Sequence, residues 1–139
     1  MKKPLLSLWV LFLFLSGCNS EDISNPEQGE TVNRWSFRAV NDTATIEFEV
    51  KGMTVNEPKD FTNLMFSSYK YSVNMELTEL TSGNLTLKIY KLDSISVFTK
   101  IYSAIGSYNN IDSCTPSLNH IMLVPYNFSG KGKLIVFVR

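Results

Sequence analysis

Residues able to perform acid–base or nucleophilic chemistry are few in this sequence and do not cluster. His120 is the only histidine of the 139 residues, which excludes a metal site with two histidine ligands and leaves one base for a Ser-His-acid arrangement. It stands beside the apolar run 121–124, and we therefore expect a residue at a strand end. Glu47 and Glu49 would point the same way from one strand, as the paired carboxylates of glycosidases can. Their alternating positions are typical of a solvated strand face, so we predict no catalytic residue and no enzyme.

Ligands for a metal ion or a phosphate group are equally sparse. The expected loops offer four oxygen-bearing side chains to a structural calcium ion: Asp93, Asn109, Asn110 and Asp112. They do not form a recognisable ligand series, and we predict no metal site and no cofactor. The segment 130–133, Gly-Lys-Gly-Lys, lacks the spacing of a phosphate-binding loop and predicts a turn before the last strand. Cys114 is expected in a loop, where an inert thiol, a reactive thiol and an intermolecular disulfide all remain open.

The first eighteen residues have the layout of an export signal. Lys2 and Lys3 precede an apolar run over 5–15 that only Ser7 interrupts, and small residues follow it. The run is too short to cross about 30 Å of hydrocarbon, which takes about 20 residues. It ends on Leu15-Ser16-Gly17-Cys18, and this motif resembles the lipobox of bacterial lipoproteins. No motif in the rest of the chain resembles a known family.

The resemblance implies a lipid anchor at Cys18. In bacterial lipoproteins the cysteine thiol receives a diacylglyceryl group, the peptide bond before it is cleaved, and the new amino terminus is acylated. Several acyl chains attach durably to a bilayer, since each buried methylene contributes about 0.8 kcal/mol. We therefore expect a protein of the bacterial cell envelope, on the periplasmic or the surface side, and Asn19 after the cysteine favours the outer membrane. An ordinary secretory signal followed by an incidental cysteine is the alternative.

Cleavage before Cys18 would leave 122 of the 139 residues with a net charge near −2, because the signal holds two of the 13 basic residues and none of the 13 acidic ones. Such a chain has no basic field for nucleic acid, and the membrane is the partner that the anchor implies. Residues 19–33 contain several acidic side chains, Pro26 and Gly29, but few apolar ones, which is typical of a flexible spacer. We therefore divide the chain into a signal peptide (1–17), a lipidated cysteine with its tether (18–33) and one domain (34–139).

The domain has the pattern of an all-β fold. Seven segments alternate apolar and polar side chains or are mostly apolar: 35–39, 46–50, 71–77, 85–90, 95–102, 121–124 and 134–138. Turn-forming residues separate them, among them 82–84 (Ser-Gly-Asn) and 130–132 (Gly-Lys-Gly). About seven short strands predict an antiparallel β-sandwich of the immunoglobulin-like or jelly-roll type. Only 57–68, with Pro58 at a first helical position, favours a helix, and a crossover between sheets is the alternative.

One predicted hairpin supplies the candidate ligand surface. If Leu85, Leu87 and Ile89 face the core, strand 95–102 shares that face through Val97, Thr99 and Ile101 only when the connecting loop has an odd number of residues. A three-residue turn at 92–94 meets this condition. This register places five side chains together on the opposite face: Lys88, Tyr90, Phe98, Lys100 and Tyr102. The aromatic rings could stack on sugar rings with the lysines alongside, and burial of both hairpin faces is the alternative.

Three functions follow from these patterns. The sparse polar clustering favours a non-catalytic binding or interaction module, with a glycan as the candidate ligand. The alternative is a structural or assembly subunit of an envelope complex, which would use Trp35 or the terminal strand as contacts. A hydrolase that uses Glu47 is the function that the sequence supports least, and the fold type alone does not assign any of the three.

Overall fold

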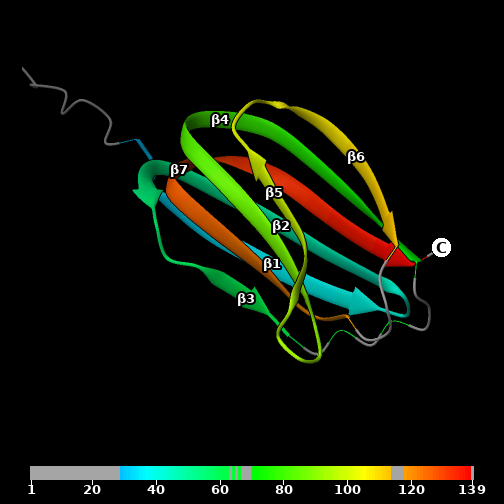
Figure 1. The fold of residues 1–139 in the computed structure, drawn as a ribbon. Coiled ribbons are helices and arrows are strands. Elements are labelled where there is room, and N and C mark those ends of the chain that lie inside the picture. The colour runs from blue at the N-terminus through cyan, green and yellow to red at the C-terminus, as the bar shows by residue number, and fades with distance from the viewer. Residues whose placement is uncertain (1–28, 63, 65, 67–69, 114–117, 139) are drawn as a thin grey trace, which may run out of the picture.

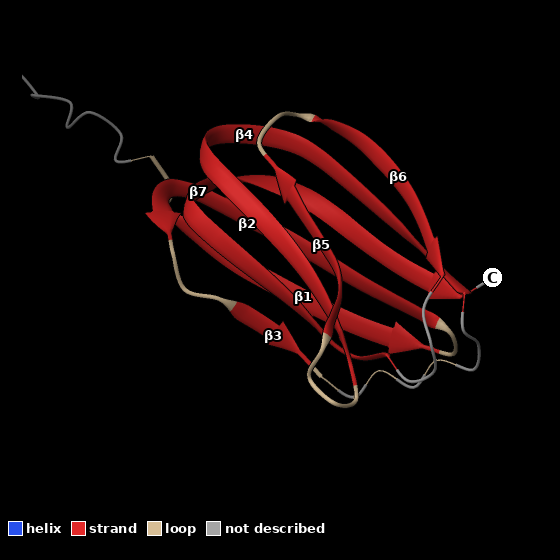
Figure 2. Ribbon diagram, viewed as in Figure 1, coloured by secondary structure: helices blue, strands red, loops and turns tan. Residues whose placement is uncertain are grey.

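The computed structural model describes residues 29–62, 64, 66, 70–113 and 118–138. Seven strands make up its regular structure (Figures 1 and 2): β1 Val32–Val40, β2 Thr43–Val55, β3 Lys59–Phe61, β4 Lys70–Lys91, β5 Ser96–Tyr102, β6 Gly106–Ser113 and β7 Leu118–Val138. These residues form no helix, and hence no helical segment with the length and hydrophobicity needed to span a bilayer. The predicted signal peptide, Cys18, most of the tether and Cys114 lie outside the described residues.

All strand pairs are antiparallel, and they form one sheet folded into two layers (Figure 1). The first layer has the order β1-β2-β7-β4-β6 and uses the second half of β7 and the first half of β4. The second layer has the order β3-β7-β4-β5 and uses the other halves of the same two strands. The architecture is therefore a sandwich whose two layers share β4 and β7.

The sheet folds over where β4 and β7 pass from one layer to the other. The β4–β7 register shifts three times between Leu77 and Asn84, and each β-bulge increases the local bend of the strand. Gly83 has a φ of 71° and Asn127 a φ of 45° at this bend. The Ser82 hydroxyl donates to the Asn127 carbonyl at 2.9 Å, and the Asn127 amide donates to Oδ1 of Asn56 at 2.6 Å. Side-chain hydrogen bonds thus replace ladder bonds that the bend interrupts.

The all-β antiparallel sandwich of seven strands confirms the predicted fold class, but two predicted turns are wrong. Residues 82–84 lie inside β4 and residues 130–132 lie inside β7, so each long strand unites two of the predicted segments. The glycines mark close packing rather than a turn in β7. A Cβ atom at Gly132 would lie 2.5 Å from the Glu76 carbonyl oxygen and 2.7 Å from Cζ of Phe48.

Two further strands were not expected. The segment 57–68 contains β3, paired with β7, and its described residues form no helix, so the preference for a helix is wrong. Three residues of strand are held there by pairing with a distant part of the chain, which a local pattern does not reveal. The second unexpected strand is β6, whose Gly-Ser-Tyr-Asn-Asn sequence carries little apolar alternation.

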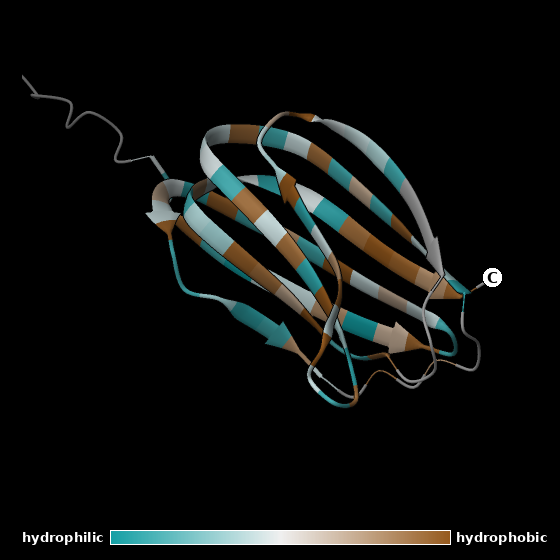
Figure 3. Cartoon of the chain, in the orientation of Figure 1, coloured by the Kyte–Doolittle hydropathy of each residue, from teal (hydrophilic) through white to brown (hydrophobic). Residues whose placement is uncertain are grey.

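The core lies between the two layers. Inward side chains of β2, β4 and β7 alternate with outward polar ones, which Figure 3 shows as brown and teal bands along these strands. Completely buried members include Ile46, Val73, Leu87, Ile121 and Leu134. An aromatic cluster closes the core near the bend: the ring centroids of Trp35 and Phe48 are 5.3 Å apart, and those of Phe48 and Phe128 are 5.8 Å apart.

Candidate functional site

The hairpin of β4 and β5 does not present the predicted five-residue surface. Its turn is as expected, with three residues at 92–94 closed by a bond from the Lys91 amide to the Ile95 carbonyl at 3.1 Å. A β-bulge follows, however: Tyr90 pairs with Ser96 but Ile89 pairs with Phe98, so Val97 is an additional residue. One extra residue turns every later side chain of β5 to the other face. The predicted register beyond the turn is therefore wrong.

The bulge divides the five residues between two faces. Phe98, Lys100 and Tyr102 pair with Ile89, Leu87 and Leu85, which are buried, and so point to the inner side of the second layer. Tyr102 is only 1% exposed and packs its ring edge-on against Tyr108 with centroids 5.0 Å apart, while Phe98 is half-buried against the core and Lys100 is exposed. Lys88 and Tyr90 stay on the outer side of this layer. The structure thus leaves only two of the five side chains, Lys88 and Tyr90, on the outer face.

Tyr90 has a different neighbour from those expected. Its ring stacks on the ring of His120 with a centroid distance of 4.4 Å and an angle of 15°. His120 lies at the beginning of β7, which confirms its place at a strand end, and its Nε2 atom lies 4.0 Å from Oδ1 of Asp60. No group of three or more His, Cys, Asp or Glu side chains that could hold a metal ion occurs among the described residues.

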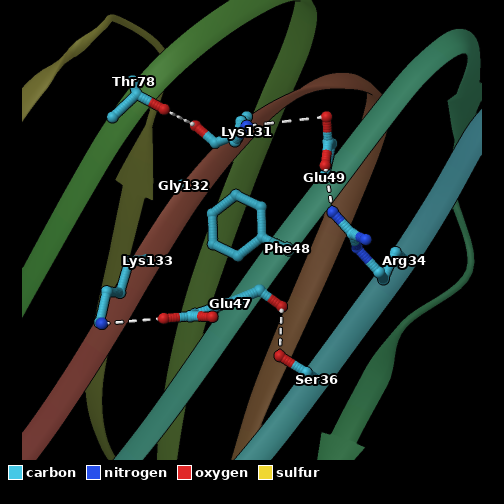
Figure 4. Close-up of a pocket in the computed structure, with 9 residues that line it drawn as sticks. All are labelled: Arg34, Ser36, Glu47, Phe48, Glu49, Thr78, Lys131, Gly132 and Lys133. Carbon is cyan, nitrogen blue, oxygen red and sulfur yellow. Dashed lines mark hydrogen bonds and ion pairs between the residues drawn. The ribbon is translucent and has the colours of Figure 1, made fainter.

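A hollow lined by polar and charged side chains lies on the outer face of the first layer, and we call it the outer groove (Figure 4). It has a volume of about 340 Å³ and nine lining residues: Arg34, Ser36, Glu47, Phe48, Glu49, Thr78, Lys131, Gly132 and Lys133. The strand register builds it. Arg34 pairs with Glu49 and Glu49 with Lys131 in one row, while Ser36 pairs with Glu47 and Glu47 with Lys133 in the next. Side chains of three strands therefore stand side by side on one surface.

Two neighbouring hollows extend the outer groove across the layer. One, of about 340 Å³, continues over β1 and β2 along Arg38 and Thr45. The other, of about 270 Å³, continues over β4 and β6 along Asn74, Glu76 and Asn109. Lys133 lines all three hollows. The polar surface thus runs from β1 to β6, and with a spacing of about 4.8 Å between strands it is about 19 Å wide.

Ion pairs join the charged side chains of the outer groove (Figure 4). Nη2 of Arg34 lies 2.6 Å from Oε2 of Glu49, whose Oε1 lies 3.7 Å from Nζ of Lys131. Nζ of Lys133 lies 2.8 Å from Oε1 of Glu47. The hydrogen bond and the charge of Lys133 hold the pKa of Glu47 below its ordinary value of 4.5. A glycosidase acid needs a raised pKa so that it keeps its proton, whereas the lowered pKa of Glu47 keeps this carboxylate ionised and able to accept hydrogen bonds.

The sequence identified only a part of this site. The exposed position of Glu47 confirms the predicted solvated strand face, but the lysines at 131 and 133 were assigned to a turn. The available signal was the period-two spacing of charged and hydroxyl side chains in three segments: Arg34, Ser36 and Arg38; Glu47 and Glu49; Lys131 and Lys133. Its interpretation required the strand order, which places β7 beside β2.

The sequence matches no family model and no curated protein. Among solved structures, the chain is similar to a protein of Bacillus endospore appendages, a family of disulfide-linked pili, with 10% identity and a TM-score of 0.48 over 84% of this chain and 97% of that chain. It is also similar to a CBM4 module (9% identity, TM-score 0.42, 80% of this chain and 81% of that chain) and to the ligand-free CBM1 of BiXyn10A (10%, 0.45, 81% and 94%). At these identities the similarity concerns the fold alone.

Proposed function

We propose that this protein is a lipid-anchored envelope protein whose β-sandwich is a non-catalytic module that binds a glycan in the outer groove. The observation that carries the proposal is the row of hydrogen-bonding side chains centred on Lys133, which lines all three hollows of the surface. A module of this kind needs no reacting group, and the paired carboxylate of Glu47 supplies an acceptor.

The chemistry of the groove suits a polyhydroxylated ligand. Sugar hydroxyl groups both donate and accept hydrogen bonds, and the groove offers donors from Arg34, Lys131 and Lys133 beside acceptors from Glu47 and Glu49. Positive and negative charges alternate, so the surface favours a neutral chain over a strongly anionic one. The ion pairs place donors and acceptors side by side across the strands. The extension over five strands suits an oligosaccharide rather than a single sugar.

A glycan array tests the ligand class. The mature chain carries Cys18→Ser so that it stays unacylated, and the measured variant is Lys133→Met, which removes the central ammonium group but keeps most of its length. We expect at least about a tenfold loss of affinity, the size of one charged hydrogen bond. Lys88→Met is the matched control, because Lys88 lies on the outer side of the other layer. A loss confined to Lys88→Met would instead assign binding to that side.

The lipid anchor has its own test. In cells, the parent chain is expected in the membrane fraction and the Cys18→Ser variant in the soluble envelope fraction. Mass spectrometry of the parent should find an acylated amino terminus at residue 18. Equal partition of both chains, or a mature terminus at another residue, contradicts anchoring. Isolation of a stoichiometric envelope protein with the parent, together with an empty glycan array, would favour the assembly role over glycan binding.

A further inference from the structure

The strand β5 leaves one side of its backbone free. It pairs with β4 along one edge, and no described strand pairs with its other edge. Thr99, Lys100 and Ile101 are exposed, and Ile101 is 60% exposed. A free edge is a template for a further strand unless prolines, bulges or charged side chains, lysine above all, protect it. After the bulge at Val97, β5 contains no proline, and Lys100 is its one charged residue.

We infer that two copies of this chain associate through antiparallel pairing of their β5 strands. Thr99 is the central residue of the seven in β5, so a twofold axis through Thr99 gives the longest pairing of the strand with its copy, with the bulge at Val97 near its end. Shifting the axis by one residue shortens the pairing, and an axis at Lys100 places two ammonium groups opposite each other, which is destabilising. The axis through Thr99 therefore gives the longest pairing and also keeps the two Lys100 side chains from lying opposite each other.

The cross-strand pairs of this register are complementary. Thr99 faces Thr99, and Phe98 faces Lys100, where the ammonium group can lie over the aromatic ring. Val97 is the bulged residue and packs against the core, so it takes no part in these pairs. Two other long strands, β1 and β6, also have an edge that no described strand pairs with. β1 has Ser36 at its centre, and the same symmetric pairing there would oppose Arg34 and Arg38. Charge therefore favours self-association through β5 over self-association through β1.

A pairing of seven residues is a small interface, well below the roughly 1,200 Å² that stable complexes bury. We expect a dissociation constant in the micromolar range or above, and tethering both copies to one bilayer would raise their effective concentration. The twofold axis is perpendicular to the paired sheet, so the outer grooves of both copies face the same direction. The dimer would present two grooves to one ligand surface, although its formation does not depend on what the groove binds.

Crosslinking at the centre of each edge tests the inference. The mature chain carries Cys18→Ser and Cys114→Ser, and a cysteine is placed either by Thr99→Cys or, as the matched control, by Ser36→Cys at the centre of β1. Directly opposed residues have Cα atoms about 4.5–5.5 Å apart, within reach of a disulfide. We expect mild oxidation to give a covalent dimer for Thr99→Cys and little for Ser36→Cys. Equal crosslinking of both variants would overturn the inference.

Sedimentation of the uncrosslinked chain provides an independent measurement. The average mass of the parent should rise towards twice that of the monomer as the concentration increases from about 10 μM to about 1 mM. Thr99→Lys places like charges at the axis and should remain monomeric, with an unchanged melting temperature because Thr99 is exposed. A parent that is still monomeric at the highest concentration would overturn the inference, as would a Thr99→Lys variant that dimerises like the parent.

Discussion

Replacing Gly132 by alanine should destabilise the sandwich by about 3 kcal/mol. The new Cβ atom would lie 2.5 Å from the Glu76 carbonyl oxygen and 2.7 Å from Cζ of Phe48, whereas ordinary contacts begin at 3.4 Å. The neighbours must therefore retreat by about 0.9 Å and about 0.7 Å. Overpacking of a core typically costs about 1–3 kcal/mol. We expect the upper end because one neighbour is the backbone of β4, which cannot rotate away as a side chain can.

Thermal and urea denaturation of the Cys18→Ser chain measure this loss. For a domain of about 100 residues, a loss of about 3 kcal/mol lowers the melting temperature by about 12 °C. The domain should still fold, since total stabilities are about 5–15 kcal/mol, and the urea m value should not change. Gly29→Ala is the control, because no atom lies within 4 Å of a Cβ at Gly29, and we expect a change below about 0.5 kcal/mol.

A second substitution separates the two contacts. Phe48→Leu removes the ring but leaves the Glu76 carbonyl in place, so Gly132→Ala should cost less in that background and still be destabilising. The expected coupling is about 1 kcal/mol, which a double-mutant cycle resolves. A loss below about 1 kcal/mol for Gly132→Ala in the parent would refute the reasoning, since it would mean that β4 and β7 separate easily at this point.

Two smaller predictions concern ionisable groups. Tyr102→Phe should leave the melting temperature unchanged or raise it, because the buried Tyr102 hydroxyl makes no hydrogen bond within the described part of the chain. Burial raises the pKa of Tyr102 to about 12 from 10.0. The contribution of the protonated phenol to the free energy of unfolding is therefore complete below pH 10 and is lost as the pH rises towards 12. Over this pH range the free energy of unfolding should fall less in Tyr102→Phe than in the parent. Lys133→Met should raise the pKa of Glu47 in a carboxyl NMR titration, whereas Glu57, whose pKa is lowered by Lys59, should not respond.

Local patterns were sufficient for the fold class and insufficient for the strand boundaries. Alternation identified β2 and β5 and both halves of β4 and β7, because each half buries one face. The glycines at 83 and 132 were interpreted as turns since glycine serves both in turns and where another backbone approaches closely. Only the neighbouring strand distinguishes the two cases. The predicted and observed numbers of strands are both seven, but only by compensation. β4 and β7 each join two predicted segments into one strand, and β3 and β6 are two strands that were not predicted.

The candidate site shows the same division between local and distant information. The three-residue turn after Lys91 was predicted correctly from parity, but the bulge at Val97 reversed the faces beyond it, and no residue type announced the bulge. The outer groove depends on β7 lying beside β2, more than 80 residues away for Glu47 and Lys133. The sequence shows charged residues spaced two apart within each segment. Which of these charges lie side by side follows only from the order of the strands in the sheet.

The position of β7 at the centre of both layers has a consequence for the order in which the molecule is assembled. β2, β3 and β4 all pair with β7, and all of them precede it in the chain. A nascent chain that ends before residue 118 therefore lacks the common neighbour of three strands and leaves their inward side chains exposed to water. Neither half of the sandwich can be completed ahead of the other, so native structure should be acquired only once β7 is present to pair with both.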